Sequence, residues 1–387
     1  MINKLNKDSY HKTGILQVLP ALTSGGVERG TIEMAEALIK NGYRAYVASS
    51  GGPMISALYQ IGATHIKLPL ESKNPFTIYK NSKLLASIIK EYNIQIIHAR
   101  SRAPAWSSYL ASRMTGCKFI TTFHGVYKST NFIKRAYNAV MTKGQYIIAV
   151  SNYIDDHIKR NYIVDEQNIV VIHRGVDLSY FDPKTVNEHR IMQMAKKLNI
   201  KLDKPLILLP GRITRWKGHL YLLQALKKLP RNSFTCIFVG SDKGHIVYRK
   251  EIQSVIAEYG LNNEVAIIGN LLDMPALYML ADIVISASIE PEAFGRVVTE
   301  AQAMGRMVIA TNLGGACETV VNEKTGWLVP HDNVDILSQT IEKVLNLPQA
   351  HKDVISEAAR EHIQNNFSVE VMCDKTINLY KDILKCI

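Results

Sequence analysis

Short apolar runs rich in β-branched residues alternate with stretches of helix length, and this alternation limits the possible folds more than any other feature of the chain. Such a pattern predicts βαβ units and parallel sheets. Helices are expected between the runs, for example at Gly26–Asn41, Phe76–Tyr92 and Phe132–Lys143. In the first half the predicted strands are Ile15–Leu19, Arg44–Ala48, Thr64–Leu68, Ile94–His98, Lys118–Phe123, Tyr146–Val150 and Ile169–Ile172.

The same pattern starts again at Pro205, and 387 residues are enough for two such domains. We therefore predict an α/β protein with two Rossmann-like domains. The second series of strands is Leu206–Leu209, Thr235–Val239, Val265–Ile268, Ile283–Ala287 and Met307–Ala310. Its helices include Leu220–Lys228, Tyr248–Glu258, Met274–Leu280 and Arg296–Met304, and the tail adds Asn333–Leu345, Asp353–Asn365 and Val369–Leu384. The predicted boundaries are 1–180 for the first domain, 181–203 for a polar linker, 204–367 for the second domain and 368–387 for a final helix.

Several general features indicate a cytoplasmic protein. No run approaches 18 apolar residues, and the polar segment Met1–Lys12 lacks the apolar core of a signal peptide. The five cysteines form no C-x-x-C pair, which is typical of reduced thiols.

Positive charge is concentrated in the first half. The net charge is +12, and residues 72–154 carry a single acid, Glu91, beside twelve basic residues. Such a surface attracts polyanions, so the candidate partners are an anionic membrane, a phosphorylated acceptor or nucleic acid. The alternative is a solvated surface without a partner.

The strongest motif is Glu292-Ala-Phe-Gly-Arg-Val-Val-Thr-Glu300, which follows one predicted strand and opens a helix. Glu292 is expected at the carboxyl end of the strand, where open α/β sheets bind ligands. Gly295 and the amides after it would form a helix N-terminus that receives ligand oxygens. Glu300 lies about one turn further, and a carboxylate there can accept hydrogen bonds from both hydroxyls of a ribose. Taken alone, the motif also fits an acidic helix N-terminus that is stabilised by the helix dipole.

A second motif, Pro210-Gly-Arg212-Ile-Thr-Arg215-Trp-Lys217-Gly218, directly follows the first strand of the second series. A strand, a glycine turn and basic residues before a helix suit a diphosphate, because arginine offers a planar fork and lysine a point charge. The sequence is not a Walker loop.

Together the motifs resemble the family 4 glycosyltransferases of the GT-B fold, of the type that builds bacterial lipopolysaccharides and surface glycans. The resemblance covers nearly the whole chain, in the order of the family. It also rests on Gly25-Gly-Val-Glu-Arg29, Thr122-Phe-His-Gly125, Val150-Ser151, His173-Arg-Gly-Val-Asp177, Asn312-Leu-Gly-Gly-Ala-Cys-Glu318 and Gly326-Trp-Leu-Val-Pro330.

The resemblance implies two domains facing each other across a donor-binding cleft, with the last helix crossing back to the first domain. It also implies a role for each matching residue. Arg212 and Lys217 would bind the donor diphosphate, and Glu300 would hold the ribose. Glu292 and the amides around Phe294 and Gly295 would touch the transferred sugar. From the first domain, Gly25 and Gly26 would bring a helix N-terminus near the phosphates, and His124 would lie at the reacting sugar.

The chemistry implied is retaining hexosyl transfer from a nucleotide-diphosphate sugar, UDP- or GDP-linked. Arg212, Lys217 and helix amides can neutralise the leaving group, and the chain has no D-x-D triplet to hold a metal. We therefore expect no metal and no cofactor.

The resemblance assigns the acceptor to the basic first domain, and a lipid-linked or phosphorylated glycan is expected. Phe76–Tyr92 and Phe132–Tyr137 combine basic with apolar residues, so they would suit an anionic membrane at its inner face. Their apolar sides could instead simply pack on the sheet.

Two other classes stay open at this point. A GT-B-fold sugar-nucleotide epimerase would use the same donor site. A polyanion- or nucleic-acid-binding protein is favoured only by charge, because the chain carries no recognisable nucleic-acid motif, and we expect no nucleic acid.

Overall fold

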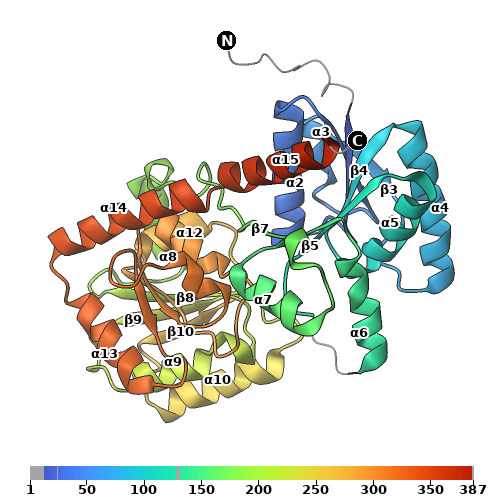
Figure 1. Cartoon of the computed structure of the whole chain (residues 1–387). Coiled ribbons are helices and arrows are strands. Elements are labelled where there is room, and N and C mark those ends of the chain that lie inside the picture. The colour runs from blue at the N-terminus through green and yellow to red at the C-terminus, as the bar shows by residue number, and fades with distance from the viewer. Residues whose placement is uncertain (1–12, 24, 128–130, 386–387) are drawn as a thin grey trace. The chain divides into compact units, whose positions relative to one another are not determined.

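The computed structural model describes residues 13–23, 25–127 and 131–385 (Figure 1). The chain divides into two compact units. Met1–Gly175 and Val369–Ile387 form the first unit, and Val176–Ser368 forms the second.

The first unit is built on a parallel sheet with the strand order β3-β2-β1-β4-β5-β6-β7. Its strands are β1 (Gly14–Val18), β2 (Arg44–Ser49), β3 (Thr64–Lys67), β4 (Ile94–Ala99), β5 (Lys118–Phe123), β6 (Tyr146–Ala149) and β7 (Ile169–Val171). Its helices are α2 (Gly26–Lys40), α3 (Ile55–Gln60), α4 (Pro75–Glu91), α5 (Arg102–Thr115), α6 (Phe132–Asn138), α7 (Asn152–Asn161) and α15 (Val369–Lys385), with short 3₁₀ turns at Ala139–Thr142 and Glu166–Asn168.

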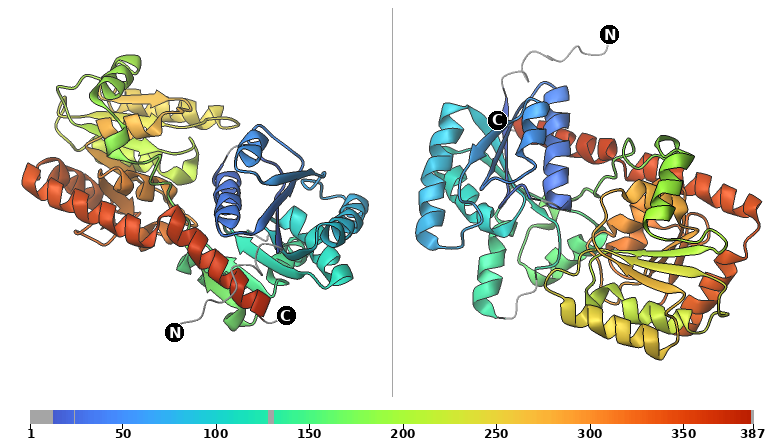
Figure 2. Two further views of the ribbon diagram at one scale, coloured as in Figure 1. Left: turned by 90° about the horizontal axis from the view of Figure 1, so that it is seen from above. Right: turned by 180° about the vertical axis from the view of Figure 1, so that it is seen from behind.

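Helices cover both faces of this sheet. On one face, alternate side chains of β1, β2, β4 and β5 form a core with apolar residues of α2 and α15. Helix α15 packs directly on α2, and the two lie side by side in Figures 1 and 2. On the other face α5 packs on β4 and β5, and α4 packs on α5. The central strands β1, β4 and β5 are therefore almost fully buried, as is typical of parallel sheets, whereas the edge strands β3 and β7 are only partly buried.

The second unit has a parallel sheet with the order β10-β9-β8-β11-β12-β13. Its strands are β8 (Leu206–Pro210), β9 (Thr235–Val239), β10 (Val265–Ile268), β11 (Ile283–Ser286), β12 (Met307–Thr311) and β13 (Trp327–Val329). Its helices are α8 (Glu188–Lys197), α9 (His219–Leu226), α10 (Ile246–Glu258), α11 (Met274–Leu280), α12 (Arg296–Ala303), α13 (Val334–Leu345) and α14 (Gln349–Asn366), with 3₁₀ turns at Pro183–Thr185, Arg215–Lys217 and Gly315–Thr319. Apolar residues of α9, α10 and α13 fill one face, and those of α8, α11 and α12 fill the other.

The predicted strands agree with the observed ones to within about a residue at each end. Strand β13 was not predicted, because three residues between turns carry too short a pattern. The helix expected at Phe132–Lys143 is divided into α6 and a 3₁₀ turn. Helix α14 begins at Gln349, four residues earlier than expected.

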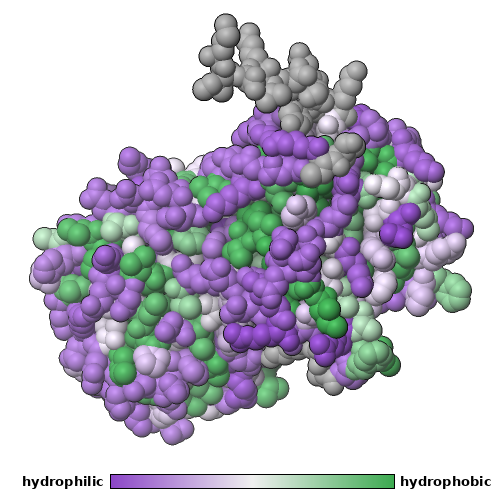
Figure 3. Space-filling model, in the orientation of Figure 1, coloured by the Kyte–Doolittle hydropathy of each residue, from purple (hydrophilic) through white to green (hydrophobic). Residues whose placement is uncertain are grey.

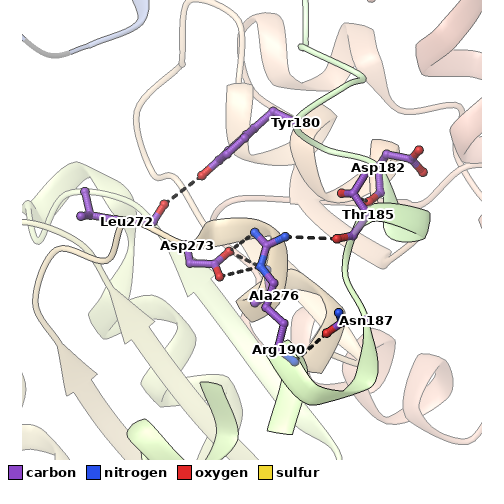
Figure 4. A network of polar contacts seen from close by, with 8 residues as sticks. All are labelled: Tyr180, Asp182, Thr185, Asn187, Arg190, Leu272, Asp273 and Ala276. Atoms are coloured by element: carbon purple, nitrogen blue, oxygen red, sulfur yellow. Dashed lines mark hydrogen bonds and ion pairs between the residues drawn. The ribbon is translucent and has the colours of Figure 1, made fainter. Parts of the chain in front are cut away.

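The linker expected at 181–203 is wrong, because this segment is part of the second unit (Figure 4). Phe181, Met194 and Ile200 are buried in its core. Arg190 in α8 donates two hydrogen bonds to the carboxylate of Asp273, from Nε to Oδ2 at 2.8 Å and from Nη2 to Oδ1 at 2.6 Å. Asp273 also caps the N-terminus of α11. The polar composition reflects the outward face of a short amphipathic helix rather than a connection between domains.

Candidate functional site

An ion pair between Lys217 and Glu292 lies at the carboxyl edge of the second sheet. The Nζ of Lys217 is 2.6 Å from Oε1 of Glu292, and each side chain is only 10% exposed. Lys217 comes from the turn after β8, and Glu292 from the loop between β11 and α12. The structure thus joins two residues that the sequence placed in separate motifs. Nζ of Lys217 also lies 4.6 Å from the ring centre of Trp216.

Glu292 is held as a carboxylate by several donors. Burial raises its pKa, but the charge of Lys217 and the hydrogen bonds that Glu292 accepts outweigh this effect, so that its pKa lies below the usual value. The bonds come from Lys217, from Oγ of Ser288 at 2.5 Å and from Oγ of Ser286 at 3.3 Å. The two serines were not among the predicted site residues. The carboxylate fixes the ammonium group in place before any ligand binds.

Glycines allow the loops at this edge to approach closely. Gly218 has φ +73°, and a Cβ there would lie 1.7 Å from the carbonyl oxygen of Ala287, just after β11. A Cβ on Gly240, which follows β9, would lie 1.9 Å from the carbonyl oxygen of Gly211. The ends of β8, β9 and β11 therefore meet at one place, and any other residue at these two positions would push them apart.

Arg212 is exposed in the same loop. Its side chain makes no hydrogen bond or ion pair within the described part of the chain, and only its carbonyl oxygen is used, by Thr214. Two cations of the loop are already paired, Lys217 with Glu292 and Arg215 with Glu251, and Arg212 is available to a ligand.

Helix α12 begins at this edge with an uncapped N-terminus. Gly295 precedes it with φ +87°, and no side chain caps the helix. A Cβ on Gly295 would lie 2.6 Å from Cβ of Ala316, so this glycine also permits a close contact. The amide of Gly315 donates to the carbonyl oxygen of Glu292 at 2.7 Å and anchors the loop. The site thus adds a helix N-terminus, which favours anionic oxygens, to the two cations.

Phe294 has a different place from the other predicted site residues. Its side chain is buried in the apolar core, with its ring 6.0 Å from that of Phe367. The side chain therefore anchors the loop in the core rather than facing a ligand.

Glu300 lies in α12, and its carboxylate is nearly buried. The hydroxyl of Tyr278 donates to Oε2 at 3.1 Å, and Arg296 pairs with Oε1 at 3.0 Å. Burial, and next the charge of Glu300, raise the pKa of Tyr278 well above its usual value, so the phenol stays a donor. Each carboxylate oxygen keeps a lone pair for a further donor. The sequence did not single out Tyr278, because it lies on the preceding helix, outside the motif that contains Glu300.

In the first unit, Gly25 and Gly26 form the start of α2 after β1. Gly25 has φ +147° and is exposed, no side chain caps the helix, and the amide of Arg29 donates to the carbonyl oxygen of Gly25 at 3.1 Å. This is a second helix N-terminus open to an anion.

His124 follows β5 in the same unit and is held by Arg174. Its Nδ1 lies 3.0 Å from Nη2 of Arg174, and its Nε2 is buried without a partner. Burial first, and then the charge of Arg174, lower the pKa of His124 well below its usual value. The imidazole is therefore neutral at physiological pH. Because a guanidinium can only donate, Nδ1 accepts and the proton lies on Nε2.

Two absences concern only the residues that the structure describes. No three His, Cys, Asp or Glu side chains among them are arranged to hold a metal ion. No helix among them has the length and apolar character that crossing a membrane would require.

Comparisons with known proteins give the class of the chain. Residues 24–180 match the model of "Glycosyltransferase Family 4", and residues 191–362 match that of "Glycosyl transferases group 1". A glycosyltransferase from Rickettsia africae has a crystal structure with a TM-score of 0.90 and 47% sequence identity, and the match covers 97% of this chain and 100% of that one. The chain belongs to the family 4 glycosyltransferases and has the GT-B fold.

Two more distant proteins match over almost their whole length. The crystal structure of Anabaena HepE in complex with UDP and glucose has a TM-score of 0.82 at 21% identity, covering 96% of this chain and 100% of that one. The Escherichia coli UDP-Gal:alpha-D-GlcNAc-diphosphoundecaprenol alpha-1,3-galactosyltransferase is 25% identical over 98% of this chain and 99% of its own length. The predicted fold class and enzyme class are thus confirmed.

Proposed function

We propose that this glycosyltransferase transfers a hexose, with retention of anomeric configuration, from a uridine-diphosphate sugar to a lipid-linked or phosphorylated glycan in surface-polysaccharide or lipopolysaccharide synthesis. The observation that carries the proposal is the edge of the second sheet, where Lys217, Arg212 and the start of α12 converge. UDP is favoured over GDP by the UDP and UDP-galactose in the descriptions of the two distant relatives. The E. coli relative's name also contains a diphosphoundecaprenol-linked acceptor.

In the proposed mechanism the charge that develops on the departing diphosphate is neutralised by protein groups. Arg212 and Lys217 contact its oxygens, and the amides at the start of α12 add their partial positive charge. The carboxylate of Glu292 keeps Lys217 oriented and contacts the transferred sugar. The acceptor hydroxyl attacks the anomeric carbon on the face from which the diphosphate leaves, and a leaving-phosphate oxygen takes its proton. These cations make a metal ion unnecessary in the proposal.

Glu300 binds the ribose in this proposal. It lies about one helical turn beyond the first amides of α12, which are proposed to bind the phosphates. Tyr278 and Arg296 orient the carboxylate, and the two ribose hydroxyls donate to the remaining lone pairs.

We further propose that the first unit binds an anionic membrane at the inner face of the cell membrane. Phe76 at the start of α4 is 87% exposed, and Phe132 and Ile133 at the start of α6 are 83% and 77% exposed. Both helices follow strands of a parallel sheet, so their first turns lie at its carboxyl edge. Figure 3 shows hydrophobic surface where Figure 1 draws α6 and the lower end of α4.

Basic side chains surround these apolar tips. Lys80 and Lys83 are exposed in α4, and Lys134 and Arg135 are exposed in α6. The inner apolar side of α4, with Leu85 and the nearby Ile89, is buried within its own unit instead. The membrane would therefore meet only the first turns, which supports a peripheral, charge-dependent contact.

The test of the proposed reaction is product analysis with UDP-glucose and UDP-galactose in the presence of EDTA. The proposal predicts slow release of UDP and free α-hexose from one of the donors, and faster release when a glycan acceptor is added. Release of the β anomer, or a requirement for Mn²⁺, would contradict retention or metal independence. Conversion of the donor to another nucleotide sugar without acceptor would point to an epimerase.

A further inference from the structure

Arg100 occupies a special place in the first unit. It directly follows β4 and lies at the carboxyl edge of the sheet, beside β1. The chain builds β2 and β3 on one side of β1 and then places β4 on the other, so the strand order reverses between β1 and β4. In open parallel sheets the crevice at such a reversal is the usual place for a ligand.

The guanidinium of Arg100 is buried, yet most of its donors are unused. The side chain is only 6% exposed, and Nη1 donates to Oε1 of Gln17 at 3.0 Å. Nε is buried without any acceptor, and the described residues provide neither an acceptor for Nη2 nor a carboxylate within ion-pair distance. Residue 30 of α2, which faces Nη2, is a glycine, and even a Cβ there would lie 3.4 Å from that nitrogen.

This arrangement is unfavourable for a purely structural arginine. Burial lowers the pKa of Arg100, and contributions from neighbours that include Glu33 offset it only in part. The hydrogen bond to Gln17 does not require a cation, because an uncharged amide side chain at position 100 could also donate to Oε1 of Gln17. The other amide atom of Gln17, Nε2, already donates to the carbonyl oxygen of Thr31. Burying a cation without a counter-ion is costly. The cost is explained if a ligand supplies the counter-ion.

A second unused donor lies at the end of the neighbouring strand β5. Nε2 of His124 carries the proton, is buried and has no acceptor. The two groups are close enough for the charge of Arg100 to contribute to the lowered pKa of His124. Both groups can only donate, and one of them is a cation. A neutral hydroxyl could satisfy the donors but not the charge, whereas an oxyanion would satisfy both.

We propose that Arg100, with Nε2 of His124 as a second donor, forms a subsite for an oxyanion of the acceptor, a phosphate or carboxylate group. The proposal rests on the proposed function, since it assigns the anion to the acceptor substrate. The Nε–Nη2 edge of a guanidinium binds two oxygens of such a group in a planar fork. Arg100 would thus select acidic acceptors over neutral ones.

The experiment measures thermal shifts of the full chain with UDP present at saturation, so that phosphate binding in the second unit is blocked. The probes are glucose 6-phosphate, glucuronate and glucose. An acidic probe should raise the melting temperature and glucose should not, and the stronger of the two acids identifies phosphate or carboxylate as the recognised group.

Arg100→Gln keeps a donor for Gln17 and removes the charge, so binding of the acidic probe should weaken roughly ten- to hundredfold. Arg113→Gln removes an exposed arginine from α5 in the same unit and should change nothing. Arg100→Lys keeps the charge but lacks the planar fork, so it should bind the acidic probe with intermediate strength. This second variant tests the proposal even if Arg100→Gln does not fold.

Three results would overturn the proposal: no shift of the wild type with either acid, an equal shift with glucose, or an unchanged acid shift in both Arg100 variants. If UDP alone does not raise the melting temperature, the proposed donor is wrong, but the Arg100 subsite is not affected. The reason is that the donor residues Lys217 and Glu300 belong to the other unit. The acidic probes are then measured without UDP.

Discussion

The hydroxyl of Tyr380 lies 2.6 Å from Nδ1 of His98, although 282 residues separate them in the chain. Both side chains are fully buried, and Nε2 of His98 lies 2.6 Å from Oγ1 of Thr122. One imidazole therefore ties α15 to β4 and β5, just below the edge that carries Arg100 and His124. The last helix is part of the first unit through this bond as well as through its apolar face.

Tyr380→Phe should lower the free energy of unfolding by about 1–3 kcal/mol, because it leaves a buried imidazole nitrogen without its partner. Urea unfolding measures the change. Tyr59→Phe removes an exposed hydroxyl from α3 of the same unit and should have no effect. Equal stability of the two variants would mean that the bond between Tyr380 and His98 contributes nothing.

Glu292→Gln should lower the free energy of unfolding by about 3–5 kcal/mol at neutral pH, because it leaves the buried ammonium of Lys217 unpaired. The folded-state pKa of Glu292 is below its usual value of 4.5, so the stability that its charge contributes is complete above that value and is lost as the pH falls through the folded pKa. Urea unfolding of both proteins from pH 7 downward should show the difference shrinking below about pH 4.5. A difference that stays constant down to acid pH would show that the charge of Glu292 is not responsible.

Glu300→Gln should weaken UDP binding about tenfold or more, since an amide nitrogen replaces one acceptor of the ribose hydroxyls. Calorimetric titration with UDP and with inorganic diphosphate distinguishes binding of the uridine from binding of the diphosphate. The variant should lose affinity for UDP and keep its affinity for diphosphate. Parallel losses for both ligands would place Glu300 away from the ribose.

Replacing Phe132 and Ile133 by serine should reduce binding to phosphatidylglycerol vesicles severalfold, because it removes the apolar tip of α6. Vesicle co-sedimentation at low and high salt gives the readout, and binding should fall as salt rises. Ile163→Ser is the matched control, because this exposed residue follows α7 at the opposite edge of the same sheet. If the control loses as much binding, or the wild type does not bind at low salt, the membrane contact is refuted.

The sequence predicted most of the fold because its signals are local. A buried parallel strand such as Leu206–Pro210 is a continuous apolar run, and the glycines Gly211 and Gly295 mark the loops of the candidate site. The linker was mispredicted because polar composition hid the few buried residues of α8. The pattern of such a short amphipathic helix is difficult to separate from that of a polar loop.

The partners within the site could not be predicted, because they come from different helices and strands. Tyr278 reaches Glu300 from another helix, and Gln17 meets Arg100 from another strand. No local period encodes such contacts. Motif spacing did place Lys217 and Glu292 at the same edge of the sheet, but only the structure shows that they form a buried ion pair.

Thermal stabilisation by UDP in the presence of EDTA tests the central claim most directly. A ligand that binds only the folded state adds about 2.7 kcal/mol at a hundredfold excess over Kd. UDP should raise the melting temperature of the wild type and of Lys250→Ala, which removes an exposed lysine from α10. The rise should be much smaller in Arg212→Ala, and GDP should have a weaker effect than UDP. If UDP gives no shift with EDTA, or an equal shift in Arg212→Ala, the donor site proposed at the edge of the second sheet is contradicted.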